Sequence, residues 1–201
     1  LNSQPMGFYA PAQLVRDARQ HGVEVLPVDV LRSEAESVLV PAGVVGAAAG
    51  RGLGEGEPPR AVRLGFERVA GLSLEAGQRI VAARAAAPFA SAEDLARRAS
   101  LNAHELGALA QADALQGITG HRHQAAWSVA GIDTRPTPML RETRVHEAAA
   151  VLAAPSEAED MQADYRTLGL TLKRHPLALL RDELAAKFKV QPAAVLRTYP
   201  H

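Results

Sequence analysis

One stretch decides the fold that this sequence predicts: Arg68-Val-Ala-Gly-Leu-Ser-Leu-Glu-Ala-Gly-Gln-Arg-Ile-Val-Ala-Ala-Arg84. The apolar residues Val69 and Leu72 lie on either side of Gly71, and glycine adopts the positive φ of a tight turn without steric cost. Ser73 is of a residue type that favours the N-cap of a helix, and the segment after it is rich in Ala. The pattern predicts a tight turn and a helix that begins directly after Ser73.

A turn of this kind between two packed helices is a helix-hairpin-helix. Because the first amides of a helix have no partner inside it, several N–H groups after the turn would point outward and attract phosphate. Phosphate contacts need no particular base, so the prediction is sequence-independent binding of a nucleic-acid backbone. The candidate DNA-binding residues of the stretch are Arg68, Gly71, Leu72, Ser73 and Arg79. The usual form of the hairpin has a second Gly at the place of Ser73. The side chain of Ser73 therefore limits how closely a phosphate could approach the turn.

A second, degenerate copy of the hairpin follows at Leu109-Ala-Gln-Ala-Asp-Ala-Leu115, with another helix after Gly120. Two further helices are predicted between the copies, because Ser91 and Asn102 are N-cap residue types with an acidic residue three positions later. The second copy adds three candidate DNA-binding residues: Ala112, Asp113 and Ala114. Two packed hairpins can hold phosphates on one or both strands of a duplex, so we expect double-stranded DNA as the partner.

Composition is that of a globular protein, with 47% hydrophobic and 22% charged residues in a chain of 201. The absence of Cys excludes disulfides and thiolate metal sites and is typical of a reducing cytosol, so we expect a cytoplasmic protein. The 22 basic and 22 acidic residues balance, and residues 60–130 hold eight Arg against six acidic residues. DNA binding should therefore be local and modest, with an affinity for duplex DNA that falls steeply as salt rises.

The sequence predicts no membrane-spanning segment, since its longest mostly apolar run, residues 38–49, is short and contains Pro41, Gly43 and Gly46. The first residues lack a Met, a basic region and a long apolar core, so we expect no signal peptide there. These first residues are typical of a segment taken from within a longer chain.

The predicted fold is mainly α with a small β portion, in three parts. Residues 1–66 carry a short helix from Pro11 and three short strands, with a flexible Gly/Ala/Pro loop at 41–59. Residues 67–130 form the tandem helix-hairpin-helix domain. Residues 131–201 form a linker and an extended helical tail.

No catalytic residues are predicted, because no nucleophile, base and orienting group occur in a recognisable arrangement. No metal site is predicted either, since His104, His121 and His123 lack zinc-ligand spacing and have no Cys nearby. These histidines are expected to be solvated or packed, and Trp127 is expected in the core beside its neighbouring alanines. We expect this chain to bind no cofactor.

Several blocks of the sequence, in order, resemble the bacterial C-family DNA polymerases, and the error-prone branch more than the replicative alpha subunit. The blocks are Gly7-Phe-Tyr-Ala-Pro11, Asp17-Ala-Arg-Gln-His-Gly-Val-Glu-Val-Leu-Pro-Val-Asp-Val30, Arg63-Leu-Gly-Phe-Glu-Arg-Val-Ala-Gly-Leu72, Arg79-Ile-Val-Ala-Ala-Arg84, Pro88-Phe-Ala-Ser-Ala-Glu-Asp-Leu-Ala-Arg-Arg98, Ala112-Asp-Ala-Leu115, Gly120-His-Arg-His-Gln-Ala-Ala-Trp127, Asp164-Tyr165 and His175-Pro176-Leu177. Two residues depart from the family pattern: Val28 and Leu31 stand where the family usually has Pro and Asn.

The resemblance implies the end of a fingers region, a tandem helix-hairpin-helix module that holds duplex DNA, and a tail leading to an OB-fold after His201. For the full-length protein it implies template-directed DNA synthesis by two-metal phosphoryl transfer, used in damage-induced mutagenesis (translesion synthesis) and DNA repair. The divalent metal, Mg²⁺, is held in the family's palm, outside these residues, so we expect no polymerase activity from this chain by itself.

Two other classes of function stay open. The hairpins could be a scaffold whose tail recruits accessory mutasome proteins or the sliding clamp, since net charge is zero and Ser73 replaces a Gly. An independent hydrolase would need a His and Asp arrangement that the sequence does not offer.

Overall fold

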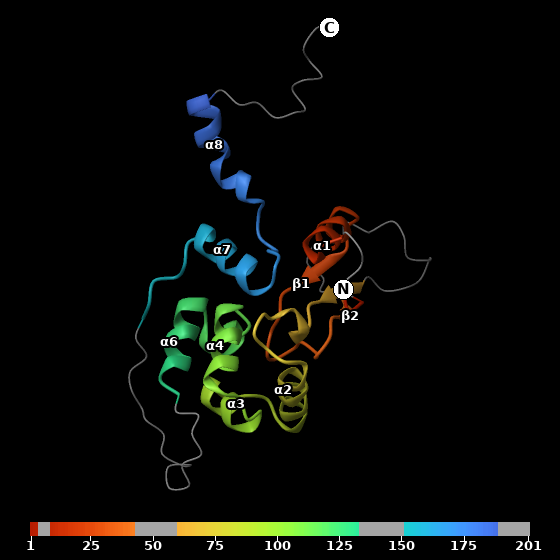
Figure 1. Ribbon diagram of the computed structural model, residues 1–201, viewed down its shortest axis with the longest axis vertical. Helices are drawn as coiled ribbons and strands as arrows, with labels where there is room; N and C mark the ends of the chain where they lie inside the picture. The colour runs from red at the N-terminus through yellow and green to blue at the C-terminus, as the bar shows by residue number, and fades with distance from the viewer. Residues whose placement is uncertain (4–8, 43–59, 133–150, 189–201) are drawn as a thin grey trace.

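The structure, a computed structural model, describes residues 1–3, 9–42, 60–132 and 151–188 (Figure 1). These residues form eight α-helices, a 3₁₀ helix and a three-stranded sheet. The predicted class, mainly α with a small β portion, is confirmed. Most of the predicted 41–59 loop, and residues 133–150 and 189–201 of the predicted tail, lie outside the described residues.

The small sheet belongs to the N-terminal part of the chain. Helix α1 precedes it, and its strand order is β1-β3-β2, with β1 parallel and β2 antiparallel to β3. The proline in β2 is the last residue of an edge strand, a place where proline is tolerated. The bounds are α1 Pro11–Gln20, β1 Glu24–Leu26, β2 Val38–Pro41 and β3 Arg60–Arg63.

The central strand turns a different face inward from the one its pattern predicts. The alternation of residues 62–66 predicts that Val62, Leu64 and Phe66 share one face of a strand and that Arg63 lies on the other; instead Ala61 and Arg63 are buried and Val62 is half-buried. The strand ends at Arg63, so the alternation does not continue into Leu64. Arg63 tolerates burial because its Nη1 donates to the carbonyl of Pro27 at 3.0 Å; burial nevertheless lowers the pKa of its guanidinium.

Six further elements follow the sheet without interruption. Ser73, Ser91 and Asn102 cap α2, α3 and α4 as predicted, each accepting the amide three residues later. Asn102 and Glu105 form a complete capping box. The bounds are η1 Phe66–Arg68, α2 Leu74–Ala86, α3 Ala92–Arg98, α4 Ala103–Gln111, α5 Gln116–Thr119 and α6 Arg122–Ala130.

Two helices lie in the last described segment, α7 (Glu157–Thr167) and α8 (Pro176–Phe188). Helix α7 crosses one end of the α4 and α6 pair, whereas α8 extends away from the rest of the protein (Figure 1). None of the helices in the described segments combines the length and the apolarity needed to cross a bilayer.

A single hydrophobic cluster includes residues of α1, α2, α3, α4 and α6 and of the segments that follow β1, β3 and α7. It runs in sequence from Val15 on α1, through Leu64 and Leu109, to Leu170 just after α7. Arg84 adds polar links between α2 and the chain after β1, since its Nη1 donates to the carbonyls of residues 30 and 33 at 3.1 and 2.6 Å. The predicted boundaries at 66/67 and 130/131 stay predictions, and the described residues on both sides of them share one core.

Candidate nucleic-acid interface

The first predicted turn forms between η1 and α2. Gly71 has φ +85°, the left-handed conformation that favours glycine. The Oγ of Ser73 accepts the N–H of Ala76 at 3.1 Å, which makes Ser73 the N-cap of α2. Gly71 and Ser73 are both exposed. The turn and the helix start that the sequence predicts are therefore present at the surface.

The amides of this turn divide into two groups. The N–H of Leu72 donates to the carbonyl of Val69 at 3.1 Å and is used within the turn. In the described part of the chain, the N–H groups of Gly71, Ser73 and Leu74 have no protein acceptor, and all three residues are exposed. The turn therefore presents unpartnered donors at the positive end of a helix dipole.

Helix α7 holds this turn from one side. The N–H of Ala70 donates to the carbonyl of Thr167, in the last turn of α7, at 2.7 Å. Arg68 adds a weaker bond from its Nη2 to the carbonyl of Leu168 at 3.4 Å. The position of the exposed amides is thus fixed by a segment a hundred residues away in sequence.

The second predicted turn is buried. Asp113 has φ +58°, so the chain does turn sharply there, but Ala112 and Ala114 are only 4% and 0% exposed. The N–H groups of Ala112, Asp113 and Ala114 donate to carbonyls of α4 at 3.0, 3.1 and 3.0 Å. The expectation that this turn presents bare amides is wrong, because it is the end of a helix, where amides close the last carbonyls. Contact of these residues with DNA stays a prediction.

A different segment repeats the order of the first turn. Gly120 has φ +86° and is exposed, and His121 is the N-cap of α6, its Nδ1 accepting the N–H of Gln124 at 3.3 Å. Glycine at positive φ, an N-cap and a helix follow one another as they do at Gly71, Ser73 and α2. The sequence placed a helix after Gly120 but did not identify this start as a contact, because histidine is not a usual N-cap residue.

A family model described as "Helix-hairpin-helix motif" matches residues 22–125, more than half of the chain. The chain belongs to the helix-hairpin-helix family. Error-prone DNA polymerases are similar to it over nearly its whole length, so the resemblance stated from the sequence is confirmed. One from Azoarcus sp. (strain BH72) is 52% identical over 207 residues, and one from Methylococcus capsulatus (strain Bath) is 49% identical over 193. These alignments cover 98% and 92% of this chain but 18% of each relative, so the chain spans less than a fifth of their length.

The arginines of the helix-hairpin-helix domain are used to hold the protein together. Arg79 donates from Nε to the carbonyl of Ala99 at 2.9 Å and from Nη2 to Glu105 at 2.9 Å, which joins α2 to α4. Arg68 contacts the end of α7, as described above. The other arginines of residues 60–130 also have partners within the chain: Arg60, Arg63, Arg84, Arg97, Arg98 and Arg122. Arg68 and Arg79 as phosphate contacts stay predictions, and each would need to leave or share a partner.

A buried ionic cluster ties α7 to the start of α6. Arg122, 6% exposed, donates from Nη1 to a carboxylate oxygen of Asp160 at 2.6 Å and from Nη2 to Asp164 at 2.5 Å. Lys173 pairs with the other oxygen of Asp160, and Thr171 donates to the other oxygen of Asp164 at 2.8 Å. The cluster lines a cleft of about 480 Å³ beside the second turn.

Asp113 lies against this cluster without a hydrogen bond for its Oδ1 in the described part of the chain. Burial raises the pKa of its carboxyl, and the nearby Asp160 and Asp164 add to the rise, while Arg122 and Lys173 oppose it. The carboxyl of Asp113 therefore lies against the ionic cluster, and its contact with DNA stays a prediction.

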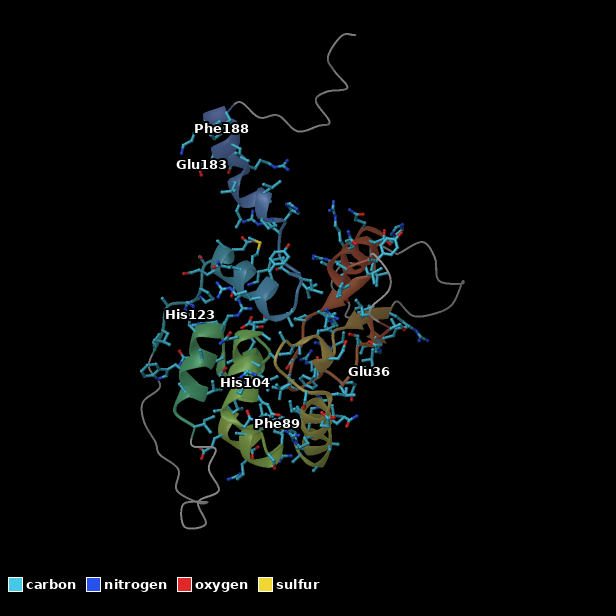
Figure 2. All side chains as sticks on the ribbon, in the orientation of Figure 1. Glu36, Phe89, His104, His123, Glu183 and Phe188 are labelled. Carbon is cyan, nitrogen blue, oxygen red and sulfur yellow. The ribbon has the colours of Figure 1, made fainter. Side chains whose placement is uncertain are left out.

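Two side chains at the first turn were missed by the sequence analysis. The pKa of Glu75 is lowered by a hydrogen bond from its own N–H and another from the Ser73 hydroxyl. Its carboxylate is therefore an anion of the protein itself at the start of α2. His104, labelled in Figure 2, lies against Gly71, since a Cβ on Gly71 would be 3.0 Å from its Nε2. Glu75 follows Ser73 by two residues, so its spacing was visible in the sequence, whereas His104 is on another helix and could not be found by spacing.

Trp127 is not in the core. It is 60% exposed on α6, so the expectation that it packs inside is wrong. Its neighbour Ala125 takes the buried position on that helix, and a residue two places further along a helix points to a different face. Within the described residues, no group of three or more His, Asp or Glu side chains is arranged to hold a metal ion.

Replacing Gly71 with Ala should lower the free energy of unfolding by about 1–2 kcal/mol, the cost of a left-handed conformation for a residue with a Cβ. The new Cβ would also press on His104. Gly107→Ala is the matched control, because that Cβ would meet nothing within 4 Å on a helix and should stabilise by up to about 1 kcal/mol. Urea denaturation of both variants measures the change in the free energy of unfolding. Equal changes in the two variants would contradict the claim that only glycine fits the left-handed conformation at position 71.

Replacing Asp113 with Asn should raise the free energy of unfolding at pH 7. A raised pKa means that the folded state holds the proton more tightly than the unfolded chain, so stability is lost as pH rises above the ordinary value of 3.8. The gain in the free energy of unfolding should therefore shrink as the pH is lowered toward 4. The backbone should not be strained by the substitution, because Asn tolerates the positive φ of this position. Denaturation at pH 7 and pH 4 tests this, with the exposed Asp182→Asn as control. A destabilised Asp113→Asn at pH 7 would show that the ionised carboxylate supports the cluster.

Proposed function

We propose that this chain binds the backbone of duplex DNA, irrespective of base sequence, as part of an error-prone DNA polymerase. The observation that carries the proposal is the exposed start of α2, where Gly71, Ser73 and Leu74 offer unpartnered amides in a helix-hairpin-helix domain. The relatives that bear the name of such a polymerase support the setting. Amides at a helix start are suited to phosphate oxygens and carry no base specificity.

The start of α6 is the second proposed contact. Its N-cap His121 follows the exposed Gly120, and the N–H of the exposed His123 has no acceptor among the described residues. Helices α4 and α6 pack side by side, as Figure 1 shows, and α7 contacts α4. Arg79 links α2 to α4, so both helix starts belong to one group of packed helices.

In the whole protein, the proposed role is to hold duplex DNA while other parts carry out template-directed synthesis during damage-induced mutagenesis in the cytoplasm. The Mg²⁺ ions of a polymerase would supply phosphoryl-transfer chemistry in the palm. The part proposed for the present residues is binding and positioning.

The proposed contact is made by amides more than by cations, which changes the expected dependence on salt. Arginines that are paired inside the protein displace few counterions from DNA, so the steep dependence typical of basic DNA-binding surfaces is not expected. A plot of log affinity against log salt should have a slope of only about 1 to 2 in magnitude. Fluorescence anisotropy of the 201-residue chain with two unrelated duplexes, at several salt concentrations, measures this. Absence of binding at low salt, or a strong preference between the duplexes, would refute the proposal.

Replacing Glu75 with Gln should tighten binding to duplex DNA. The carboxylate of Glu75 occupies the helix start that a phosphate would approach, and it repels the phosphate charge. Removing the charge should increase affinity about two- to fivefold, the typical free energy of one charge at a helix N-terminus. Glu93→Gln is the matched control, since Glu93 is exposed at the same position of α3. If the two variants bind alike, the start of α2 is not the contact.

A second candidate function is recruitment of the sliding clamp or accessory mutasome proteins by the tail. One observation favours it: α8 exposes Leu177, Leu180 and Phe188 at 56%, 48% and 68%, on a helix without a buried residue. Pull-down of the purified sliding clamp by the full chain tests this candidate separately from DNA binding. Capture should be lost with Leu180→Ser and kept with Glu75→Gln.

A further inference from the structure

The start of α6 is held by the segment that leads into α7. Nε2 of His121 donates to the carbonyl of Leu152 at 3.1 Å, and Nδ1 of His123, labelled in Figure 2, donates to the carbonyl of Ala153 at 2.9 Å. Arg122 lies between these two histidines in sequence, and its guanidinium is held by carboxylates of α7. Three consecutive residues of the second proposed contact are therefore attached to one stretch of chain.

The same stretch also holds the first turn. The carbonyl of Thr167, the last residue of α7, accepts the N–H of Ala70 at 2.7 Å, and Ala70 directly precedes the glycine of the turn. Asp164, three residues before Thr167 on the helix, accepts Nη2 of Arg122 at 2.5 Å. Three residues of an α-helix rise by about 4.5 Å. The attachments to the two proposed contacts are thus less than one helical turn apart on α7.

Residues 152–168, which we call the strap, are held firmly where they meet the two contacts. Asp164, Thr167 and Leu168 are all buried. The second carboxylate oxygen of Asp164 accepts the hydroxyl of Thr171 at 2.8 Å, so both of its oxygens have partners. A buried carboxylate in this setting cannot shift without losing hydrogen bonds that are costly to leave unmade. A change of position at one end of α7 is therefore passed to the other.

Two contacts bind one duplex more tightly than either does alone only if their separation suits the duplex. We propose that the strap sets this separation, with Asp164 as its positioning residue, so that the starts of α2 and α6 engage the same duplex together. This inference rests on the proposed function and adds a fixed spacing between its two contacts. The strap is attached at residues adjoining each contact, whereas the other route between them runs through the packing of α2, α3, α4 and α6.

Fluorescence anisotropy of the 201-residue chain with loop-closed duplexes, from about half a helical turn to two turns (about 5 to 20 base pairs), provides the test. The affinity should rise about tenfold at the length that first reaches both helix starts, which is the gain from one further charge-assisted hydrogen bond. Asp164→Ala should lose most of this rise, and Asp164→Asn should keep more of it, because its amide oxygen still accepts from Arg122.

Glu157→Ala is the matched control for Asp164→Ala. It removes one carboxylate from the same helix, and the partner of that carboxylate is Arg174, which belongs to neither helix start. Both variants change the charge of the chain equally, so they should bind the shortest duplexes alike. Only Glu157→Ala should keep the full rise with duplex length.

The outcomes separate this inference from the function on which it rests. If the unaltered chain binds no duplex of any length, the proposed function fails. If it binds without a rise at any length, or if Asp164→Ala keeps the rise, only the role of the strap is overturned. An equal loss of affinity for short and long duplexes would also overturn it, because a general weakening of the fold does not depend on duplex length.

Thermal unfolding of each variant shows whether the fold is kept. If Asp164→Ala does not fold, Thr171→Val makes the same test more mildly, because it removes only the hydroxyl that donates to Asp164. Thr171→Val should lose part of the rise with duplex length, and retention of the full rise would overturn the role of the strap.

Discussion

Backbone amides are free at the start of a helix and used at its end, and the candidate site depends on this asymmetry. At α2 the chain turns through Gly71 and then begins a helix, so the donors of Gly71, Ser73 and Leu74 are left outward. At the end of α4 the chain also turns sharply, through Asp113, but there the amides close helix carbonyls. Two turns that look alike in sequence therefore have opposite consequences for an anion.

The arginines are charged, but most of them are held by partners inside the protein and are not free to contact a phosphate. A count of charges treats every Arg as available to a phosphate, yet Arg79 and Arg122 are held by carboxylates and carbonyls of neighbouring helices. Buried or half-buried guanidinium groups need such partners, because a charge away from water is costly unless it is hydrogen-bonded. What remains on the surface of the turn is a set of free amides beside the carboxylate of Glu75.

Helix α7 contacts both helix starts, although the sequence placed it in a tail. Its last carbonyls hold Ala70 and Arg68, and its carboxylates hold Arg122 at the start of α6. The cleft between them contains Asp113, whose raised pKa reflects burial among like charges. The geometry of both helix starts thus depends on a segment that follows the hairpin domain in sequence.

The sequence by itself determined the local features: the turn at Gly71, the caps at Ser73, Ser91 and Asn102, the helical class and the family. Each of these depends on residues within a few positions of one another, which a single sequence displays directly. Only the tertiary structure decided that Ala112 and Ala114 are buried, that Trp127 is exposed, and that His104 lies against Gly71. Those properties arise from packing between distant segments, so they depend on which faces meet and not on the order of residues along the chain.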